Sequence, residues 1–248
     1  MKVILLSLLF IISPQICAKE VHIGLGNFEP YFISESKTGL FKELLDLVFT
    51  YMPEHTPVYH FDHSNNRLFD GFKSSKLDAL ANIIDAVDVA PCYVSSFFHF
   101  QDVAISRKED QLKLDSISDL NGKSIITFQG ARVFYGEEFL MQTQNGEYVE
   151  LANPGHQVRQ LARGVGEVSV GDLFIFLHNL DKVSGLNKTP QDFNYHNIIP
   201  KNSSRLGFKD TKLCKVFEDA RIKMESEGSD IKIYNKYFKK YHAPEGLY

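Results

Sequence analysis

The 248-residue chain carries 27 Lys and Arg against 31 Asp and Glu, a formal net charge of −4. This mildly acidic balance gives no support for nucleic-acid binding, because proteins that bind nucleic acids usually present a basic patch. The chain is 44% hydrophobic and rich in Phe and Tyr, and its length suits two lobes of roughly 100 residues each better than one small core.

The first eighteen residues have the pattern of a signal peptide. Lys2 supplies a positive start, an apolar run follows from Val3 to Ile16, and Ala18 is the small residue expected before a cleavage site. The run is too short to cross a bilayer comfortably, which disfavours a permanent anchor. We therefore predict export and a mature protein that begins at Lys19, the alternative being a buried N-terminal strand or helix.

Strands and helices are predicted to alternate in the first part of the mature chain. The predicted strands are 21–25, 58–61 and 77–83, and the predicted helices are 39–49 and 67–76. Pro30 keeps the segment 26–31 a loop, and Pro53 ends the first helix. This β-α-β-α-β order predicts a parallel sheet with helices on its faces. Residues 97–106 are expected to be extended and to lead out of this unit.

A second series of the same kind follows. Its predicted strands are 124–128, 148–151 and 167–172, and its predicted helices are 131 to about 143, 155–163 and 173–180. Residues 194–199 are predicted to form a second extended crossing, and helices 211–227 and 230–241 end the chain.

The expected fold class is therefore α/β, with two sheets joined by two hinge crossings and a ligand cleft between the lobes. Lobe 1 is predicted to comprise residues 19–104 plus 201–248, and lobe 2 residues 105–200. Ligands of such sheets bind outside the carboxyl ends of strands. The predicted loops at those ends follow Leu25, Ala81, Phe128 and Val170.

Two cysteines remain after removal of the signal peptide, Cys92 and Cys214. They could pair in an oxidising compartment. Their separation in sequence does not show whether their Cα atoms approach closely enough, so both the bonded and the free state remain open.

Six short motifs follow one another along the mature chain. They are Glu29-Pro30-Tyr31 with Gly39–Leu44, Leu77-Asp78-Ala79, Ser118–Ile125, Gln129-Gly130-Ala131, Leu161–Asp172, and Lys212-Leu213 through Glu227-Gly228 to Phe238. In this order they resemble the amino-acid-type (family 3) solute-binding proteins of bacterial ABC importers. The resemblance implies a type II periplasmic-binding-protein fold, a periplasmic monomer that captures a small polar organic solute without a cofactor, and a membrane permease or sensor receptor as partner.

The resemblance also implies site residues. In that family an aromatic side chain of the first loop stacks on the ligand, which places Phe28 or Tyr31 there, and an aspartate of lobe 2 holds the ligand's ammonium group, which places Asp172 there. Packing of the loop and capping of the helix from Leu173 are the alternatives. The family's carboxylate-binding arginine has no counterpart, because residues 82–90 contain no basic residue. The amino-acid substrate is therefore not carried over.

Arg132 is the candidate substitute for that arginine. It follows the turn Gln129-Gly130-Ala131 and lies in the first turn of a predicted helix, where backbone N–H groups favour an anion; the alternative is a solvated surface side chain. Asn82 ends a predicted strand and could donate to and accept from a polar solute, or it could serve as a plain turn residue. Gln129 is a weaker candidate of the same kind.

Metal and catalytic motifs are not found. His55, His60 and His63 have a spacing that fits no zinc motif, and the sequence lacks a nucleophile elbow, a Walker loop and a metalloprotease His-Glu pair. We predict a binding protein without metal or enzymatic activity. The remaining alternatives are a periplasmic enzyme on the same scaffold and an interaction module that has lost small-molecule binding.

Overall fold

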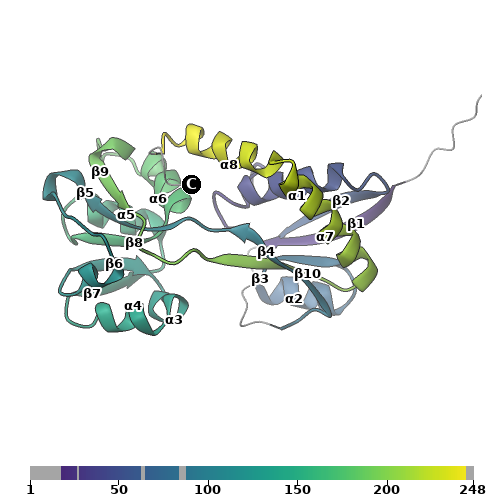
Figure 1. The fold of residues 1–248 in the computed structure, drawn as a ribbon, viewed down its shortest axis with the longest axis horizontal. Helices are drawn as coiled ribbons and strands as arrows, with labels where there is room; N and C mark the ends of the chain where they lie inside the picture. Colours follow the sequence, from purple (N-terminus) through teal and green to yellow (C-terminus); the bar gives the residue numbers. More distant parts are fainter. Residues whose placement is uncertain (1–17, 27, 63–64, 84–87, 244–248) are drawn as a thin grey trace, which may run out of the picture.

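The computed structural model describes residues 18–26, 28–62, 65–83 and 88–243. These residues form two lobes, each built on a five-stranded sheet with helices packed around it (Figure 1). The predicted α/β fold class with two sheets is confirmed. The predicted signal peptide lies outside the described residues except for Ala18. Among the described helices, none is both long and apolar enough to cross a membrane.

The first lobe contains the sheet β2-β1-β3-β10-β4. Its strands are β1 (Lys19–Gly26), β2 (His55–Asp62), β3 (Ala79–Ile83), β4 (Cys92–His99) and β10 (Ser203–Phe208), and its helices are α1 (Leu40–Thr50), α2 (Asn65–Lys73), α7 (Thr211–Ser226) and α8 (Ser229–Lys240). β1 runs parallel to β2 and β3, as the alternation of strands and helices predicts. In α1 the buried side chains recur at helical spacing and face the sheet.

The second lobe contains the sheet β7-β6-β8-β5-β9. Its strands are β5 (Asp102–Arg107), β6 (Ile125–Phe128), β7 (Tyr148–Leu151), β8 (Val168–Asp172) and β9 (Phe193–His196), and its helices are α3 (Ala131–Tyr135), α4 (Glu137–Gln142), α5 (Pro154–Ala162) and α6 (Leu173–Lys182). Short 3-10 turns occupy Lys108–Asp110, Ile117–Leu120 and Pro190–Asp192. The single helix predicted from 131 to about 143 is wrong in one respect. Gly136 has a φ of 85°, a conformation that interrupts a helix, and separates α3 from α4.

Two chain crossings join the sheets, one from β4 to β5 and one from β9 to β10 (Figure 1). The extended segment predicted over 97–106 divides into strands of different lobes, so that Asp102 to Ala104 pair with β8. The second crossing leads into β10, a strand that the sequence analysis did not predict. β10 lies between β3 and β4 and is antiparallel to both.

Helix α8 connects the two lobes on the side where the chain ends (Figure 1). Lys236 pairs with Glu43 of α1 at 2.7 Å, whereas the ring of Phe238 meets that of Phe174 in α6 with 4.9 Å between centroids. The C-terminal end of α8 therefore packs against the second lobe while its body rests on the first.

Cys92 and Cys214 form a disulfide bond, with their Cα atoms 6.3 Å apart. This settles the alternative that the sequence leaves open. The bond attaches α7 to the edge strand β4, and thereby ties the C-terminal helices to the first sheet.

Candidate functional site

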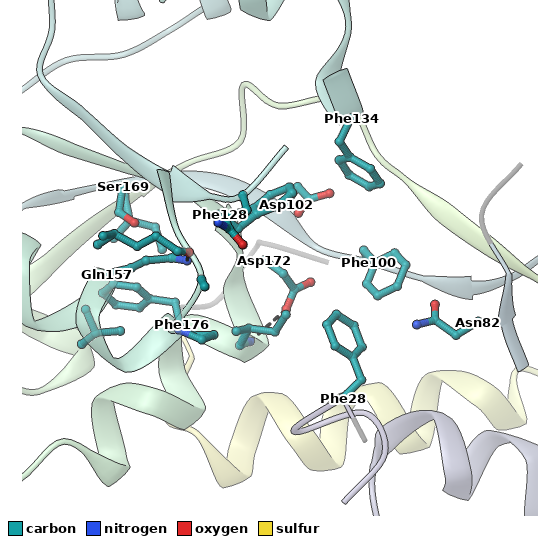
Figure 2. A pocket seen from close by; sticks show the side chains of 18 residues that line it. Phe28, Asn82, Phe100, Asp102, Phe128, Phe134, Gln157, Ser169, Asp172 and Phe176 are labelled. Carbon is teal, nitrogen blue, oxygen red and sulfur yellow. Dashed lines mark hydrogen bonds between the residues drawn. The ribbon is translucent and has the colours of Figure 1, made fainter. Parts of the chain in front are cut away.

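A cavity of about 360 Å³ lies between the lobes, beside the point where β8 meets α6. The first lobe and the crossing contribute Phe28, Asn82 and Phe100, and the second lobe contributes Asp102, Ile105, Phe128, Gln129, Phe134, Leu151, Ala152, Pro154, Gln157, Val158, Ser169, Gly171, Asp172, Ile175 and Phe176. Figure 2 shows Phe28, Phe100 and Asn82 on one side of the Asp172 carboxylate and Gln157, Ser169 and Phe176 on the other. The volume suits a small organic molecule.

Asp172 lies at the centre of the cavity wall that the second lobe contributes, and it is 8% exposed. Its Oδ1 accepts the backbone N–H of Ile175 at 2.9 Å, so the side chain caps α6. Its Oδ2 accepts the hydroxyl of Tyr31 at 2.5 Å and the backbone N–H of Gln101 at 2.9 Å. The cap that the sequence offers as an alternative to a ligand contact is thus present, and the same carboxylate lines the cavity.

Asp102 is the cross-strand neighbour of Asp172 in the β5–β8 pair and is 5% exposed. The hydroxyl of Tyr135 donates to its Oδ1, and the side-chain amide of Asn202 donates to its Oδ2, both at 3.0 Å. Two buried carboxylates therefore stand side by side on one cavity wall. Each is held by neutral donors.

Burial raises the pKa values of both carboxylates. Desolvation, reinforced by the charge of Asp102, raises the pKa of Asp172 to about 7, although its hydrogen bonds act in the opposite direction. Desolvation also raises the pKa of Asp102 above its usual range, against hydrogen bonds from Asn202 and Tyr135. Ionisation of both carboxylates on this wall therefore costs free energy unless a cation binds next to them.

The two aromatic candidates of the first loop differ in position. Phe28 lines the cavity and meets Phe100 edge-on at 5.9 Å between ring centroids. Tyr31 is fully buried behind it, stacked on Phe41 at 4.0 Å, and reaches Asp172 with its hydroxyl only. Stacking on a ligand therefore remains a prediction for Phe28 alone.

The candidates at the strand ends also differ in whether they line the cavity. Asn82 and Gln129 line the cavity. Asn82 has a φ of 59°, a turn conformation that asparagine tolerates, and its Oδ1 accepts the hydroxyl of Ser204 at 2.7 Å. Gly130 and Ala131 do not line the cavity: Gly130 donates its N–H to Glu150 at 2.9 Å, and Ala131 is buried.

Arg132 does not line the cavity either. Its guanidinium lies over the ring of Tyr148, 3.6 Å from the centroid, and donates to the carbonyl oxygen of Thr143 at 2.6 Å. The side chain thus joins α3 to the end of α4 and to β7, and the proposed anion contact has no support from this geometry.

Several lining residues were not candidates in the sequence analysis. The aromatic ones are Phe100, Phe128, Phe134 and Phe176, and the polar ones are Asp102, Gln157 and Ser169. Asp102 had one available signal, because it is the acidic residue at the start of an otherwise uncharged run that ends at Ser106. Among the described residues, no group of three or more His, Cys, Asp and Glu side chains could hold a metal ion, and His63 lies outside them.

Solved structures share this fold. The probable amino-acid ABC transporter extracellular-binding protein ytmK of Bacillus subtilis aligns with a TM-score of 0.70 at 17% identity, over 89% of this chain and 98% of that one. The amino acid ABC transporter substrate-binding protein AbpA of Streptococcus pneumoniae, bound to L-arginine, gives 0.59 at 17% identity over 90% and 95%. A histidine kinase sensor domain with similarity to periplasmic binding proteins gives 0.60 at 18% identity over 89% and 96%.

No protein-family model matches the sequence, and no curated protein matches it. The structural likeness establishes the two-lobed periplasmic-binding-protein fold, as the sequence resemblance predicted. The two transporter proteins among these neighbours are a substrate-binding protein and a probable extracellular-binding protein.

Proposed function

We propose that this chain is an exported solute-binding protein that captures a small polar organic molecule between its lobes and closes over it by hinge bending. The observation that carries the proposal is the cavity itself, because residues of both lobes build it and Asp172, which lines it, accepts a hydrogen bond from Tyr31 of the first lobe. A ligand placed there would touch both lobes, so its binding energy would favour the closed arrangement.

Two membrane partners fit the closed form, an ABC permease and a sensor receptor. Transporter binding proteins and a histidine kinase sensor domain both share the fold, so the partner class remains part of the proposal. A periplasmic location and a monomeric state belong to it as well. The proposed lobe boundaries are 19–104 plus 201–248 and 105–200, with residues 102–104 already paired into the second sheet.

The proposal is tested on the mature protein, Lys19 to Tyr248, after mass spectrometry has shown that no ligand is carried through purification. Thermal unfolding is followed against amino acids, amines, polyamines, organic acids, peptides and sugars. A ligand that binds only the folded state at about 100 times its Kd stabilises it by about 2.7 kcal/mol, which gives a clear rise in midpoint. Small-angle scattering should then show a decrease in the radius of gyration with the same ligand.

Silence across the whole panel, with unchanged scattering, would contradict the proposal and favour an interaction module without small-molecule binding. Chemical conversion of a bound compound, instead of its recovery intact, would favour an enzyme on the same scaffold.

A further inference from the structure

The charged side chains at the cavity all have the same sign. Among the described residues that line it, Asp102 and Asp172 are the only ionisable ones, and no Lys, Arg or His is present. The polar remainder consists of neutral amides and hydroxyls, among them Asn82 and Gln129. The potential inside this enclosed space is therefore set by two carboxylates, which attract a cation and repel an anion.

Within the part of the chain that the structure describes, the two carboxylates have no charged partner. Their donors are the hydroxyls of Tyr31 and Tyr135, the amide of Asn202 and two backbone N–H groups. None of the ion pairs among the described residues includes either of them. A buried carboxylate is costly without a compensating charge.

Both side chains also retain room to accept hydrogen bonds. An ionised carboxylate offers about four lone-pair sites, whereas Asp102 accepts bonds from two donors and Asp172 from three. An ammonium group has several N–H donors and a positive charge, so it satisfies both needs at once.

The rest of the wall suits an apolar body. Five phenylalanines line the cavity, namely Phe28, Phe100, Phe128, Phe134 and Phe176. Figure 2 shows the rings of Phe28 and Phe100 next to each other on one side of the Asp172 carboxylate, where they meet edge-on at 5.9 Å between centroids. Aromatic faces stabilise a nearby organic cation and pack against its hydrocarbon part. A free carboxylate on the ligand would instead have to enter this space with only neutral donors to receive it.

From these observations we infer that the solute is an organic ammonium cation with an apolar or aromatic body and without a carboxylate group. This inference rests on the proposed solute-binding function and specifies its ligand class. The ammonium group is held jointly by Asp102 and Asp172, and the body lies against the phenylalanines.

The test compares amines with their own carboxylated parents. Phenethylamine, tyramine, cadaverine and agmatine are each titrated calorimetrically beside phenylalanine, tyrosine, lysine and arginine. We expect at least one amine to bind ten-fold or more tightly than its parent. Asp172→Asn and Asp102→Asn should each weaken that amine ten-fold or more, whereas Asp219→Asn, the same change at an exposed position of α7, should leave its affinity unchanged.

Asn keeps one acceptor oxygen and caps helices well, so Asp172→Asn can retain the bond from the Ile175 N–H that caps α6, while its NH2 group replaces the oxygen that accepts from Tyr31 and Gln101. If it nevertheless fails to fold, Asp102→Asn carries the test. An amino acid that binds as tightly as its amine, binding confined to sugars or organic acids, or amine affinity that survives both Asn variants would overturn the inference and leave the proposed function standing. Absence of binding by every solute class would overturn both.

Discussion

Tyr31 and Asp172 join the two lobes through a hydrogen bond of 2.5 Å, although 141 residues separate them in the chain. Tyr31 lies in the loop after β1, and Asp172 ends β8 and caps α6. One carboxylate thus lines the cavity, begins a helix and holds the lobes together. Any hinge motion that separates the first loop from α6 must break this bond, so lobe orientation and the ligand site depend on the same side chain.

Replacement of Tyr31 by Phe tests this relationship. The ring remains buried against Phe41. The carboxylate of Asp172 loses one hydrogen-bond donor, and because the site is buried, no water molecule takes the place of the lost hydroxyl. A hydrogen bond to a charged, buried group contributes about 1–3 kcal/mol. We expect Tyr31→Phe to lower the free energy of unfolding by that amount in urea denaturation, and to enlarge the radius of gyration of the ligand-free protein.

Tyr51→Phe is the matched control, because its hydroxyl donates to Glu227 at the surface. Surface hydrogen bonds contribute little, so a change below about 0.5 kcal/mol is expected there. Equal losses of unfolding free energy in the two variants would show that the Tyr31–Asp172 hydrogen bond stabilises the protein no more than a surface hydrogen bond does.

A pH-dependent stability is the second prediction. Burial, with the charge of Asp102, raises the pKa of Asp172 from its ordinary 3.8 to about 7, while Tyr31 opposes the shift. Between these values the folded chain keeps a proton that the unfolded chain has released. The stabilisation is therefore complete below about pH 4 and is lost as the pH rises through 7.

Asp172→Asn removes this titration. Between pH 5 and pH 8 the wild type should lose about 3 kcal/mol of unfolding free energy relative to the variant, since pH 5 lies about two units below the folded-state pKa of about 7 and one pKa unit corresponds to about 1.4 kcal/mol. Urea denaturation at several pH values measures the difference, in which titrating groups remote from the Asp102–Asp172 pair cancel. The curve for Asp219→Asn should run parallel to that of the wild type. A parallel curve for Asp172→Asn would contradict an elevated pKa.

The disulfide gives the third prediction. Cys92 and Cys214 are 122 residues apart and bind α7 to β4. A cross-link over so long a segment restricts the unfolded chain strongly, and loss of such a bond typically costs 2–5 kcal/mol. The double variant Cys92→Ala/Cys214→Ala should unfold at correspondingly lower urea concentration. Reductant should lower the wild type to the same midpoint and leave the double variant unaffected; a midpoint independent of reductant would contradict a bond that contributes to stability.

The regular elements could be predicted because their apolar spacing is local. The buried face of α1 repeats at helical intervals, and the sequence places this helix within one residue of its observed ends. β10 escaped prediction because Lys201 to Ser204 are polar and Gly207 interrupts the apolar run. Its environment comes from β3 and β4, which lie far away in sequence.

The site was predictable where a single loop or strand end supplies a residue. Asn82 was named from its position at a strand end, Phe28 and Asp172 from the family resemblance, and all three line the cavity. Asp102 was missed because its importance arises from the register of β5 against β8, which places it opposite Asp172. Such a pairing joins residues 70 positions apart and leaves no trace in local spacing.

Arg132 supplies the last prediction. The sequence suggests an anion contact, yet the guanidinium lies 3.6 Å from the centroid of the Tyr148 ring and donates to Thr143. Arg132→Ala should therefore lower the free energy of unfolding by about 1–2 kcal/mol, through the lost cation–π contact and hydrogen bonds. Arg163→Ala, at an exposed position after α5, should change stability by less than about 0.5 kcal/mol. Solute affinity, measured by titration, should be the same in both variants as in the wild type. A selective loss of affinity in Arg132→Ala would return this arginine to the ligand site and argue for an anionic group on the solute.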